Sequence, residues 1–449
     1  MFRRFAISCA LLACVLPVWA RTRPHYGGTL RVETQGDPWQ KPDGIARRLV
    51  FDGLTRIGVN RSVQPALATG WEADSGYLRW EFQLRPGVHF HDGSPLTSAA
   101  VVSSLNLSCN GNCPWSTVHA VGSTVVFTSD SPMPNLPALL AGADFLISLV
   151  GSAEGAAPTN NIGTGAFQVA AAGNGVLSLK ASEAGWQGRP FADAVEIRAN
   201  RAIRDQWLDL SLGRADVVEV PAEAIRQAQQ QRLVLAMSAS AELLALQVSD
   251  NGVLSNPVLR AAIAASIDRA PIANVIFQKQ AEATAGVLPQ ALSGYSFLFS
   301  TDRDLNKARE LRGGLTVPPL TVGADGDSVM QLAAQRIVLN LREAGFNAIA
   351  AASGNGLHPD LMLRKIVLSG GSPSAVLDGV LRATGIAPVG ADVAPASLYK
   401  AERAFLDQHL LIPLVDLPCA YALGPRVRDL VMSADGLPDL VDASLEDTP

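Results

Sequence analysis

The chain has 449 residues, of which 48% are hydrophobic and 17% are charged, and its formal net charge is −5. This apolar content, without long runs of one charge, excludes a mainly disordered chain, and the length is enough for two or three domains. There is no basic stripe, so we expect no nucleic-acid partner and no binding to an anionic membrane surface.

The first twenty residues are typical of a secretory signal peptide. Arg3 and Arg4 precede an apolar run, and Val-Trp-Ala ends at Ala20 as a cleavage site would. We expect residues 1–20 to be removed on export by the Sec route, which predicts a periplasmic or secreted protein. The alternative is lipid anchoring at Cys14, because LLAC resembles a lipoprotein box. No later stretch is long and apolar enough to span a bilayer.

Strands and helices are predicted in mixed order along the rest of the chain. Before residue 240, period-two and helical patterns predict a strand at 29–34, a helix at 45–54, a strand at 78–84, a helix at 95–107, a strand at 124–130, a hairpin at 162–182, a strand at 192–200, and a helix then a strand at 203–220. After it they predict a strand at 243–250, helices at 256–277 and 304–312, a strand at 320–325, a helix at 328–346, and strands at 347–352, 360–368 and 410–417. Mixed elements in two halves predict an α/β protein with two lobes.

The sequence HFHD, at residues 89–92, has two interpretations. His89 and His91 lie on the same side of a strand, so with a third partner they could bind a metal ion. However, Asp92-Gly93 is a turn signal, and Thr97 or Ser98 could cap a following helix. We therefore favour a strand-turn-helix corner.

Three cysteines follow the predicted cleavage site: Cys109, Cys113 and Cys419. Cys109 and Cys113 are separated by the turn-forming residues Asn-Gly-Asn, and an oxidising compartment favours a local disulfide between them. Two free thiols are the alternative. Too few ligands are visible for a zinc site, so we expect neither a metal nor a cofactor.

Several motifs in a fixed order resemble those of the extracellular solute-binding proteins of family 5, the dipeptide, oligopeptide and nickel group. The most specific is WEFQLRPGVHFHDGSPLTSAAVVSSL, at residues 80–105, although Ala100 stands where the family usually has Asp. The others are YGGTLRVET, LVFDGLTR, PALATGWE, IGTGAFQV, LRAAIAASIDRAPIANVIFQKQAEATAGVLP and DLNKARELR. In the family HFHD lies in a domain away from the ligand, which supports the corner interpretation.

The resemblance implies a two-lobed periplasmic-binding-protein fold of the class II, or cluster C, type with an inserted α+β accessory domain. We expect hinge closure on a ligand held between the lobes, a monomer, and an ABC permease and ATPase as partners. Carried over to this chain, the domains are lobe I at 25–48 and 159–240 with a C-terminal tail at 425–449, the accessory domain at 49–158, and lobe II at 241–424.

The resemblance also implies two ligand-binding stretches. The first holds Thr34, Gln35 and Gly36, and it continues to Trp39. Trp39 could stack on a ligand with Gln35 as a hydrogen-bond partner. Equally, Trp39 could pack under its own loop, because tryptophan is often a core residue.

The second stretch contains Arg364, Val367, Leu368, Ser369 and Gly370. Ser369 replaces the aspartate that pairs with the ligand's amino terminus in peptide-binding members. A neutral hydroxyl forfeits a charge-assisted hydrogen bond of about 1.5–3 kcal/mol with an ammonium group. We therefore expect a peptide-like or other small solute that is neutral or anionic rather than a free-amine peptide. Arg364 could face an acidic ligand or point to solvent.

These patterns predict the solute-binding component of an ABC importer. The alternative is a degenerate binding fold that serves as a non-transport sensor or scaffold. An enzyme is not expected, because the chain has no G-x-S-x-G elbow, no H-E-x-x-H and no phosphate-binding loop.

Overall fold

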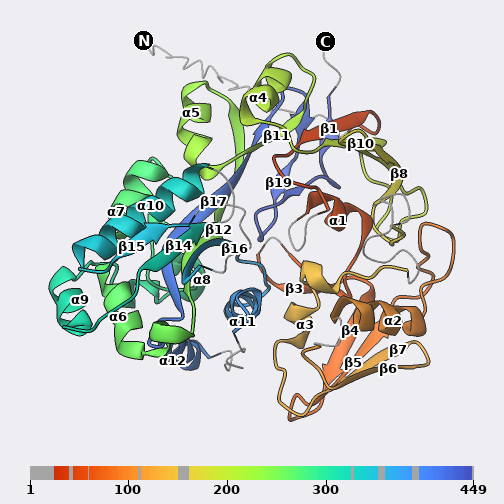
Figure 1. Cartoon of the computed structure of the whole chain (residues 1–449). Helices are drawn as coiled ribbons and strands as arrows, with labels where there is room; N and C mark the ends of the chain where they lie inside the picture. The colour runs from red at the N-terminus through yellow and green to blue at the C-terminus, as the bar shows by residue number, and fades with distance from the viewer. Residues whose placement is uncertain are drawn as a thin grey trace, which may run out of the picture.

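The structure is a computed structural model that describes residues 25–39, 44–58, 60–109, 113–149, 161–324, 328–351, 359–386 and 394–446. The predicted signal peptide and Cys14 lie outside these ranges. Three bodies are visible in Figure 1: lobe II on the left, lobe I at the upper right and an accessory domain at the lower right. Within the described ranges, no helix combines the length and the apolar character that a membrane crossing needs.

One mixed sheet passes through both lobes. Its eleven described strands follow the order β15-β14-β16-β12-β17-β11-β1-β10-β9-β8, with β13 paired to β17. Two long antiparallel strands, β12 (Val234–Val248) and β17 (Leu411–Leu423), run from one lobe into the other. Their register shifts between Met237 and Ser240 and again between Ser240 and Glu242, so the pair bends where the lobes meet.

Lobe I is built around β1, because its alternating Leu30 and Val32 are fully buried while β10 and β11 pair with it in parallel. Its strands are β1 (Thr29–Glu33), β8 (Phe167–Gly173), β9 (Val176–Ala181), β10 (Ala194–Arg198) and β11 (Val217–Val220). Its helices are α1 (Ile45–Val50), α4 (Ile203–Ser211) and α5 (Ile225–Gln230). Two short pairs come from the C-terminal tail, β18 (Val427–Arg428) with β21 (Ser444–Leu445), and β19 (Val431–Met432) with β20 (Pro438–Asp439).

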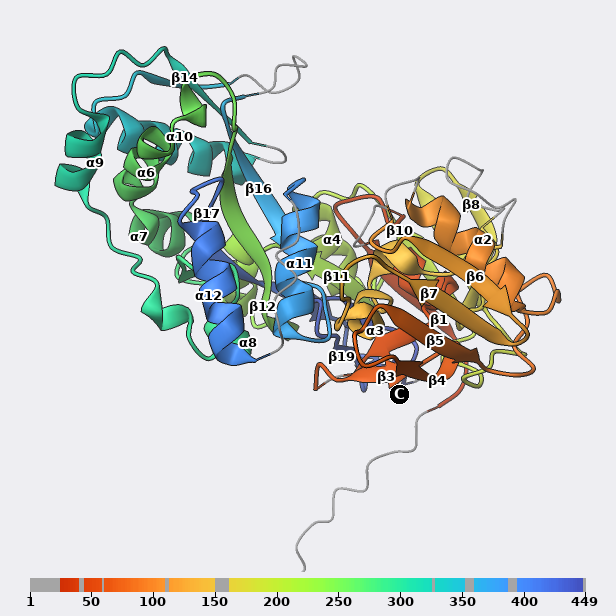
Figure 2. The same ribbon diagram turned by 90° about the horizontal axis from the view of Figure 1, so that it is seen from below.

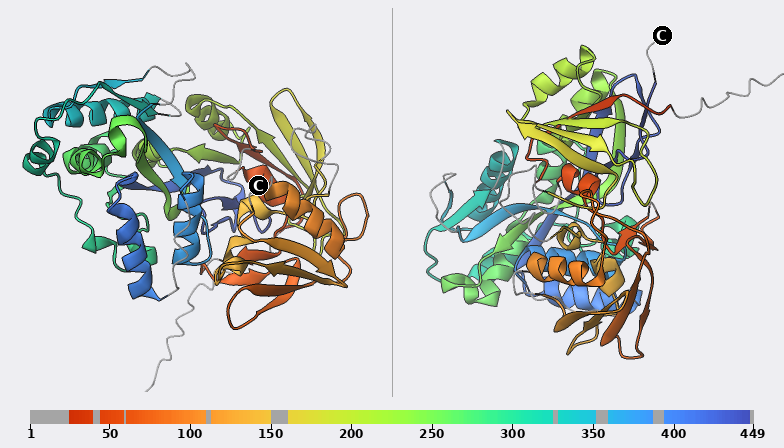
Figure 3. Two further views of the ribbon diagram at one scale, coloured as in Figure 1. Left: turned by 60° about the horizontal axis from the view of Figure 1, so that its bottom comes forward. Right: turned by 90° about the vertical axis from the view of Figure 1, so that its right-hand side faces the viewer.

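The accessory domain is an antiparallel sheet, in the order β4-β5-β7-β6, covered by one helix. Trp80, Phe82 and Leu84 alternate along one face of β5 and enter its core with Phe127, which Phe82 meets edge to face at 5.4 Å between ring centroids. The elements are β2 (Thr55–Ile57), β3 (Val63–Pro65), β4 (Ala68–Ala73), β5 (Arg79–Leu84), α2 (Ser98–Cys109), β6 (Thr117–Val121), β7 (Thr124–Thr128) and α3 (Leu136–Leu139). Figure 3 shows this sheet and the sheet of lobe I at opposite ends of the molecule.

The HFHD segment forms the corner that its turn signals favour. Asp92 accepts hydrogen bonds from the backbone and hydroxyl of Ser94, and Thr97 Oγ1 accepts one from Ala100 N at 3.1 Å at the start of α2. Both ring nitrogens of His91 contact backbone groups, at Gly163 N and Gly165 O. No group of three potential metal ligands occurs among the residues described. The segment therefore joins a strand to a helix.

A disulfide joins Cys109, at the end of α2, to Cys113, and their Cα atoms are 4.8 Å apart. This is the arrangement expected from the turn-forming residues between them. Cys419 lies in β17 and is partly buried.

Lobe II packs helices on both faces of its part of the sheet. On one face lie α6 (Pro257–Ser266), α7 (Arg269–Pro271), the π-helix Ile272–Ile276, α9 (Leu305–Arg312) and α10 (Ser328–Glu343). On the other lie α8 (Gln290–Ser293), the 3-10 helix Ser296–Leu298, α11 (Pro373–Ala383) and α12 (Pro395–Leu406). The remaining strands are β13 (Glu282–Ala283), β14 (Leu320–Ala324), β15 (Ala348–Ala350) and β16 (Leu361–Val367).

The expected two-lobed α/β architecture is therefore present. The exact domain limits stay predictions, because residue 240 falls inside β12 and residues 158 and 159 lie outside the described ranges.

Candidate functional site

A cavity of about 1000 Å³ lies between the accessory domain and lobe II. This volume is at the upper end of the range for small-molecule sites, and sites of this kind are common between domains. Seen from below in Figure 2, α11 of lobe II faces α3 of the accessory domain across this region. Four residues of the second predicted stretch line the cavity: Arg364, Val367, Ser369 and Gly370.

The lobe II wall is formed by β16, the loop after it and α11. Ser372 caps α11, because its hydroxyl accepts a hydrogen bond from Ala375 N at 3.2 Å and Pro373 follows at the first helical position. The cap sets the direction of α11, which presents Asp378 and Arg382 to the cavity one helical turn apart.

The loop before α11 is compact because it contains two glycines. Gly370 has a φ of +148°, and a Cβ on Gly371 would lie 2.5 Å from Ile57 Cδ1 and 2.8 Å from Val63 Cγ2. Ile57 and Val63 belong to the β2–β3 hairpin, so this loop brings lobe II into contact with the accessory domain. A larger side chain at residue 371 would separate them.

The accessory wall comes from the segment after β7 and from the disulfide. Its proline-rich part, Pro132-Met133-Pro134, leads into Asn135 and α3, and Cys109 and Cys113 form part of the rim. Asn135 Oδ1 lies 3.5 Å from Ser372 Oγ across the boundary between the two bodies. Prolines remove backbone donors, so the polar groups on this wall are mainly carbonyls and side chains.

Arg382 carries the most informative charge in the cavity. It is half-buried, and among the described residues its guanidinium makes no hydrogen bond or ion pair. Burial lowers the pKa of Arg382, while Asp378 and Asp144 act in the opposite direction. A guanidinium with five donors and no acceptor is suited to a carboxylate or phosphate ligand.

Two other cations line the cavity from β16. Arg364 Nη1 donates to Gln247 Oε1 at 2.9 Å, and Gln247 in turn donates to Thr384 O at 2.8 Å, which fixes the Arg364 side chain. Lys365 Nζ lies 3.9 Å from Glu242 Oε2 on the neighbouring strand. With Arg382 these make three cations against the two acids Asp144 and Asp378, so the lining has a small positive excess.

Leu368 was expected at the ligand, but it is fully buried and packs in the core of lobe II. It follows the last residue of β16, Val367, and its side chain belongs to the buried cluster that includes Val376 and Leu377 of α11, not to the cavity lining. Ser369 lies on the lining, and no carboxylate stands at that position.

The first predicted stretch does not line this cavity. Thr34 is buried with its hydroxyl donating to Gly36 O at 2.9 Å, and Gln35 N donates to Glu219 Oε2 at 2.8 Å. The Trp39 ring packs against Phe51, with 6.3 Å between centroids, in the core of lobe I. This is the packing alternative for Trp39, and a ligand role for these four residues stays a prediction.

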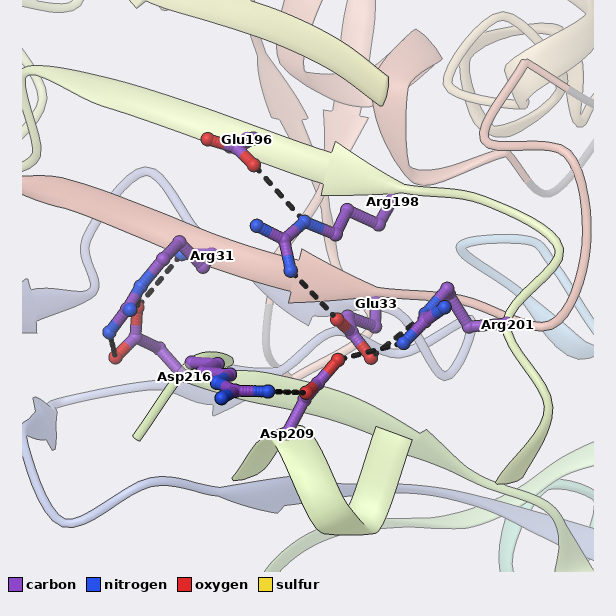
Figure 4. A network of polar contacts seen from close by, with 8 residues as sticks. Arg31, Glu33, Glu196, Arg198, Arg201, Asp209 and Asp216 are labelled. Carbon is purple, nitrogen blue, oxygen red and sulfur yellow. Dashed lines mark hydrogen bonds and ion pairs between the residues drawn. The ribbon is translucent and has the colours of Figure 1, made fainter. Parts of the chain in front are cut away.

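A buried ionic network holds the base of this first loop (Figure 4). Glu33 at the end of β1 is 1% exposed and lies 3.5 Å from Arg198 and 3.6 Å from Arg201. Arg201 Nη2 also donates to Asp209 Oδ2 at 2.7 Å. Burial, and then the neighbouring Asp209, raise the pKa of Glu33. The network joins β1 to α4 and has the features of a structural ion cluster.

Sequence reasoning missed Arg382, Asp378 and Asp144. A usable signal existed in the segment SAVLDGVLRA, where Asp378 and Arg382 stand four residues apart and therefore share one face of a helix. No comparable signal marks the accessory wall, because its position opposite α11 depends on long-range packing.

Comparison with known sequences finds a matching family model and several partial relatives. A family model described as "Bacterial extracellular solute-binding proteins, family 5 Middle" matches residues 62–349. The uncharacterized protein YhjP of Bacillus subtilis (strain 168) is 32% identical over 173 residues, which cover 36% of this chain and 29% of YhjP. The HTH-type transcriptional regulator SgrR of Yersinia pestis (strain Pestoides F) is 46% identical over 59 residues, which cover 13% of this chain and 10% of SgrR. The alignments thus span less than a third of these relatives.

Solved structures match almost the whole chain at low sequence identity. AgaA of A. tumefaciens R10, in complex with agropinic acid, has a TM-score of 0.82 at 20% identity and covers 94% of this chain and 99% of its own. DppA of Helicobacter pylori, in complex with the peptide STSA, has a TM-score of 0.77 at 18% identity, with coverage of 94% and 99%. NikA of Staphylococcus aureus, in complex with Ni(L-His)2, has a TM-score of 0.76 at 16% identity, with coverage of 93% and 100%.

These likenesses establish the fold, and the family match extends over more than half of the sequence. The chain belongs to the bacterial extracellular solute-binding proteins, family 5.

Proposed function

We propose that this protein is the periplasmic solute-binding component of an ABC importer. In this proposal it captures a small solute with an acidic group in the cavity between the accessory domain and lobe II, delivers it to a permease and ATPase complex, and does not transform it. The single observation that carries the choice of ligand is the guanidinium of Arg382 on the cavity wall, which makes no hydrogen bond or ion pair with the described residues.

Electrostatics favours an anionic group near Arg382. A half-buried cation without a partner loses part of its hydration, and a ligand carboxylate would supply two acceptors in the geometry of the guanidinium fork. Arg364 and Lys365 add positive potential on the same wall. The carboxylates of Asp144 and Asp378 could accept hydrogen bonds from a hydroxyl or amide group of the ligand. The solute we propose is therefore a polar acid.

Ser369 argues against a free-amine peptide as the main ligand. Its hydroxyl lines the cavity where peptide-binding relatives are expected to place an aspartate, and a neutral oxygen pairs poorly with a desolvated ammonium. Among the structural neighbours, AgaA is described with agropinic acid and DppA with a peptide, so the shared fold accommodates both kinds of ligand. The residues of this chain favour the acid.

The long crossing strands supply the hinge for capture. The bends in β12 and β17 lie between the lobes, and ligand contacts made only when the two bodies approach would shift the population toward the closed form. In the closed form, lobe II touches the accessory domain where Gly371 packs against the β2–β3 hairpin.

The proposal is tested by calorimetric titration of the mature chain with small dicarboxylates, hydroxy acids, neutral sugars and tripeptides. We expect an acid to bind and Arg382→Gln to weaken it at least tenfold. Arg204→Gln is the matched control, because Arg204 is exposed on α4 and outside the cavity. This variant should bind the acid with the same affinity as the wild type. Preferential binding of free-amine peptides, with no effect of Arg382→Gln, would contradict the proposal.

A second candidate is a sensor module that does not transport. It is favoured by one observation, the similarity of a 59-residue stretch to SgrR, which is named a transcriptional regulator. The two functions differ in a measurable way: an importer component stimulates the ATPase activity of its reconstituted permease complex when the ligand is present, and a sensor does not.

A further inference from the structure

A second cavity lies in lobe II and shares no lining residue with the first. Its volume is about 460 Å³, and its lining comes from β13 and the two residues after it, Gln290 of α8, the 3-10 helix Ser296–Leu298 with residues 299–302, and Asp416 of β17. Three acids line it: Glu282, Asp302 and Asp416. None of its lining residues is Lys, Arg or His. The lining therefore holds acidic groups with no cationic side chain to balance them.

Asp416 is the unusual member of this set. It is 3% exposed, lines the cavity, and its Oδ1 has no hydrogen-bond partner. Buried carboxylate oxygens are nearly always hydrogen-bonded, so an unpaired one at a cavity wall needs an explanation. A ligand donor at this point would remove the deficit.

The pairing of β13 with β17 places a second acid beside Asp416. Glu282 on β13 and Asp416 on β17 are directly opposed in the antiparallel register. Opposed positions place two side chains on one face about 5 Å apart, so ionising both carboxyl groups there is unfavourable. A cation between them would favour the ionised form of both.

The rest of the lining is mixed: polar residues (Thr284, Gln290, Ser296, Ser300 and Thr301) alternate with a wall of apolar and aromatic side chains. Phe297 is 72% exposed and Leu298 is 51% exposed, and Phe299 lies beside them on the same wall. Large apolar side chains exposed at the mouth of a cavity are suited to the hydrocarbon part of a ligand, and aromatic faces also attract cations. A bare metal ion fits less well, because no group of three potential metal ligands exists among the described residues.

From these observations we propose that the lobe II cavity binds a small organic ammonium ion, with Asp416 and Glu282 around the cationic nitrogen and Phe297 and Phe299 against its apolar part. The site is separate from the one proposed for the acidic solute, and either can fail without the other. The ligand class is an amine with a hydrocarbon or aromatic body.

Binding at this site is coupled to protonation. Burial, and then the charges of Glu282 and Glu402, raise the pKa of Asp416 to about 8. The groups that face it are Glu282 from β13, Glu402 from α12 and Asp302 across the cavity, and all are acidic. At neutral pH an incoming ammonium ion forms an ion pair with the Asp416 carboxylate and displaces the proton of that carboxyl into solvent. Affinity should therefore rise between pH 6 and pH 8.

The test uses 2-phenylethylamine as the probe and 2-phenylethanol as its neutral counterpart, titrated calorimetrically into the mature chain at pH 7 and pH 8. We expect the amine to bind at least tenfold more tightly than the alcohol. Titrations in buffers with different ionisation enthalpies should show proton release on binding of the amine. Asp416→Asn should weaken amine binding at least tenfold, and Glu282→Gln severalfold.

The matched control is Asp407→Asn, which removes an exposed acid of lobe II outside the cavity and should leave the affinity unchanged. Folding of each variant is checked by its unfolding transition. Glu282→Gln provides a second test of the site, because Glu282 is exposed and its substitution should not disturb folding. Equal binding of amine and alcohol, absence of amine binding, or unchanged affinity in Asp416→Asn would each overturn the proposal.

Discussion

Tyr295 donates a hydrogen bond from its hydroxyl to Glu402 Oε2 at 2.8 Å in the interior of lobe II. The other carboxylate oxygen accepts from Val287 N at 2.6 Å and from Leu288 N at 3.1 Å. No lysine or arginine forms an ion pair with Glu402 in the described part of the chain, and burial raises its pKa. Three donors thus satisfy a carboxyl group that fixes α12 to the loop before α8.

We predict that Tyr295→Phe lowers the free energy of unfolding by about 1–3 kcal/mol, because it leaves Glu402 Oε2 buried without a donor. Urea denaturation at pH 7 measures the change. Tyr399→Phe is the control, since its hydroxyl accepts a hydrogen bond from Arg403 at the surface and its loss should cost less than about 0.5 kcal/mol. Equal effects in the two variants would show that the Glu402 hydrogen bond contributes nothing special.

The Arg201 side chain balances two acids in lobe I. Its guanidinium lies 3.6 Å from Glu33 Oε2 and 2.7 Å from Asp209 Oδ2. We predict that Arg201→Gln lowers stability by about 1–3 kcal/mol at pH 8, because two neighbouring carboxylates lose their shared cation. The loss should be smaller at pH 4.

The loss of stability is larger at pH 8 than at pH 4 because the pKa of Glu33 is raised. Its pKa is already raised in the folded protein, and removal of Arg201 raises it further. Stability linked to such a group is present below its unfolded pKa and is lost as the pH rises through its folded pKa. The measurement is denaturation at both pH values. A Glu33→Gln background is the control, in which Arg201→Gln should cost less. A pH-independent loss in both backgrounds would contradict this account.

The sequence predicted most of the architecture because the patterns that encode it are local. Alternation of Trp80, Phe82 and Leu84 identified β5, and of the two expected caps of α2, Thr97 and Ser98, Thr97 accepts the hydrogen bond. The family motifs supplied the two-lobed arrangement. The resemblance to the family, through the alignment of the segment around Ser369, put this residue in a ligand-binding stretch, and it lies on the cavity lining.

What the sequence could not supply depends on contacts between distant segments. Arg382 was overlooked because nothing local shows that its helix faces the accessory domain. In the sequence, Asp416 looks like an ordinary residue of a hydrophobic strand. Only the pairing of β13 with β17 places Glu282 opposite it. Trp39 had two interpretations, and its packing against Phe51 is set by the fold of lobe I.

Without a ligand, Asp416 should make the protein less stable as the pH rises. Its pKa is raised from 3.8 to about 8 in the folded protein, so the stabilising contribution of the protonated form is complete below about pH 4 and is lost toward pH 8. We predict that Asp416→Asn is more stable than the wild type at pH 8 by roughly 2–5 kcal/mol and differs little at pH 4. Urea denaturation from pH 4 to pH 8.5 follows the difference. Parallel curves for the two proteins would show that Asp416 keeps an ordinary pKa.

Gly371 lets the loop after β16 approach the β2–β3 hairpin of the accessory domain. A Cβ at this position would lie 2.8 Å from Val63 Cγ2, and a branched side chain would meet both Val63 and Ile57. We predict that Gly371→Val prevents full approach of lobe II and weakens ligand binding in the larger cavity at least tenfold. Stability should change by less than about 1 kcal/mol, because the contact joins two bodies that keep their own cores.

The measurements are calorimetric affinity for the acid identified by titration and the radius of gyration in solution with and without it. Gly314→Val is the matched control, because a Cβ there meets no atom within 4 Å and Gly314 is outside the loop. We expect the control to compact on ligand binding as the wild type does, while Gly371→Val stays expanded. If Gly371→Val binds and compacts normally, the loop contact is incidental to closure, and the edge formed by Gly371 and the β2–β3 hairpin has no part in capturing the ligand.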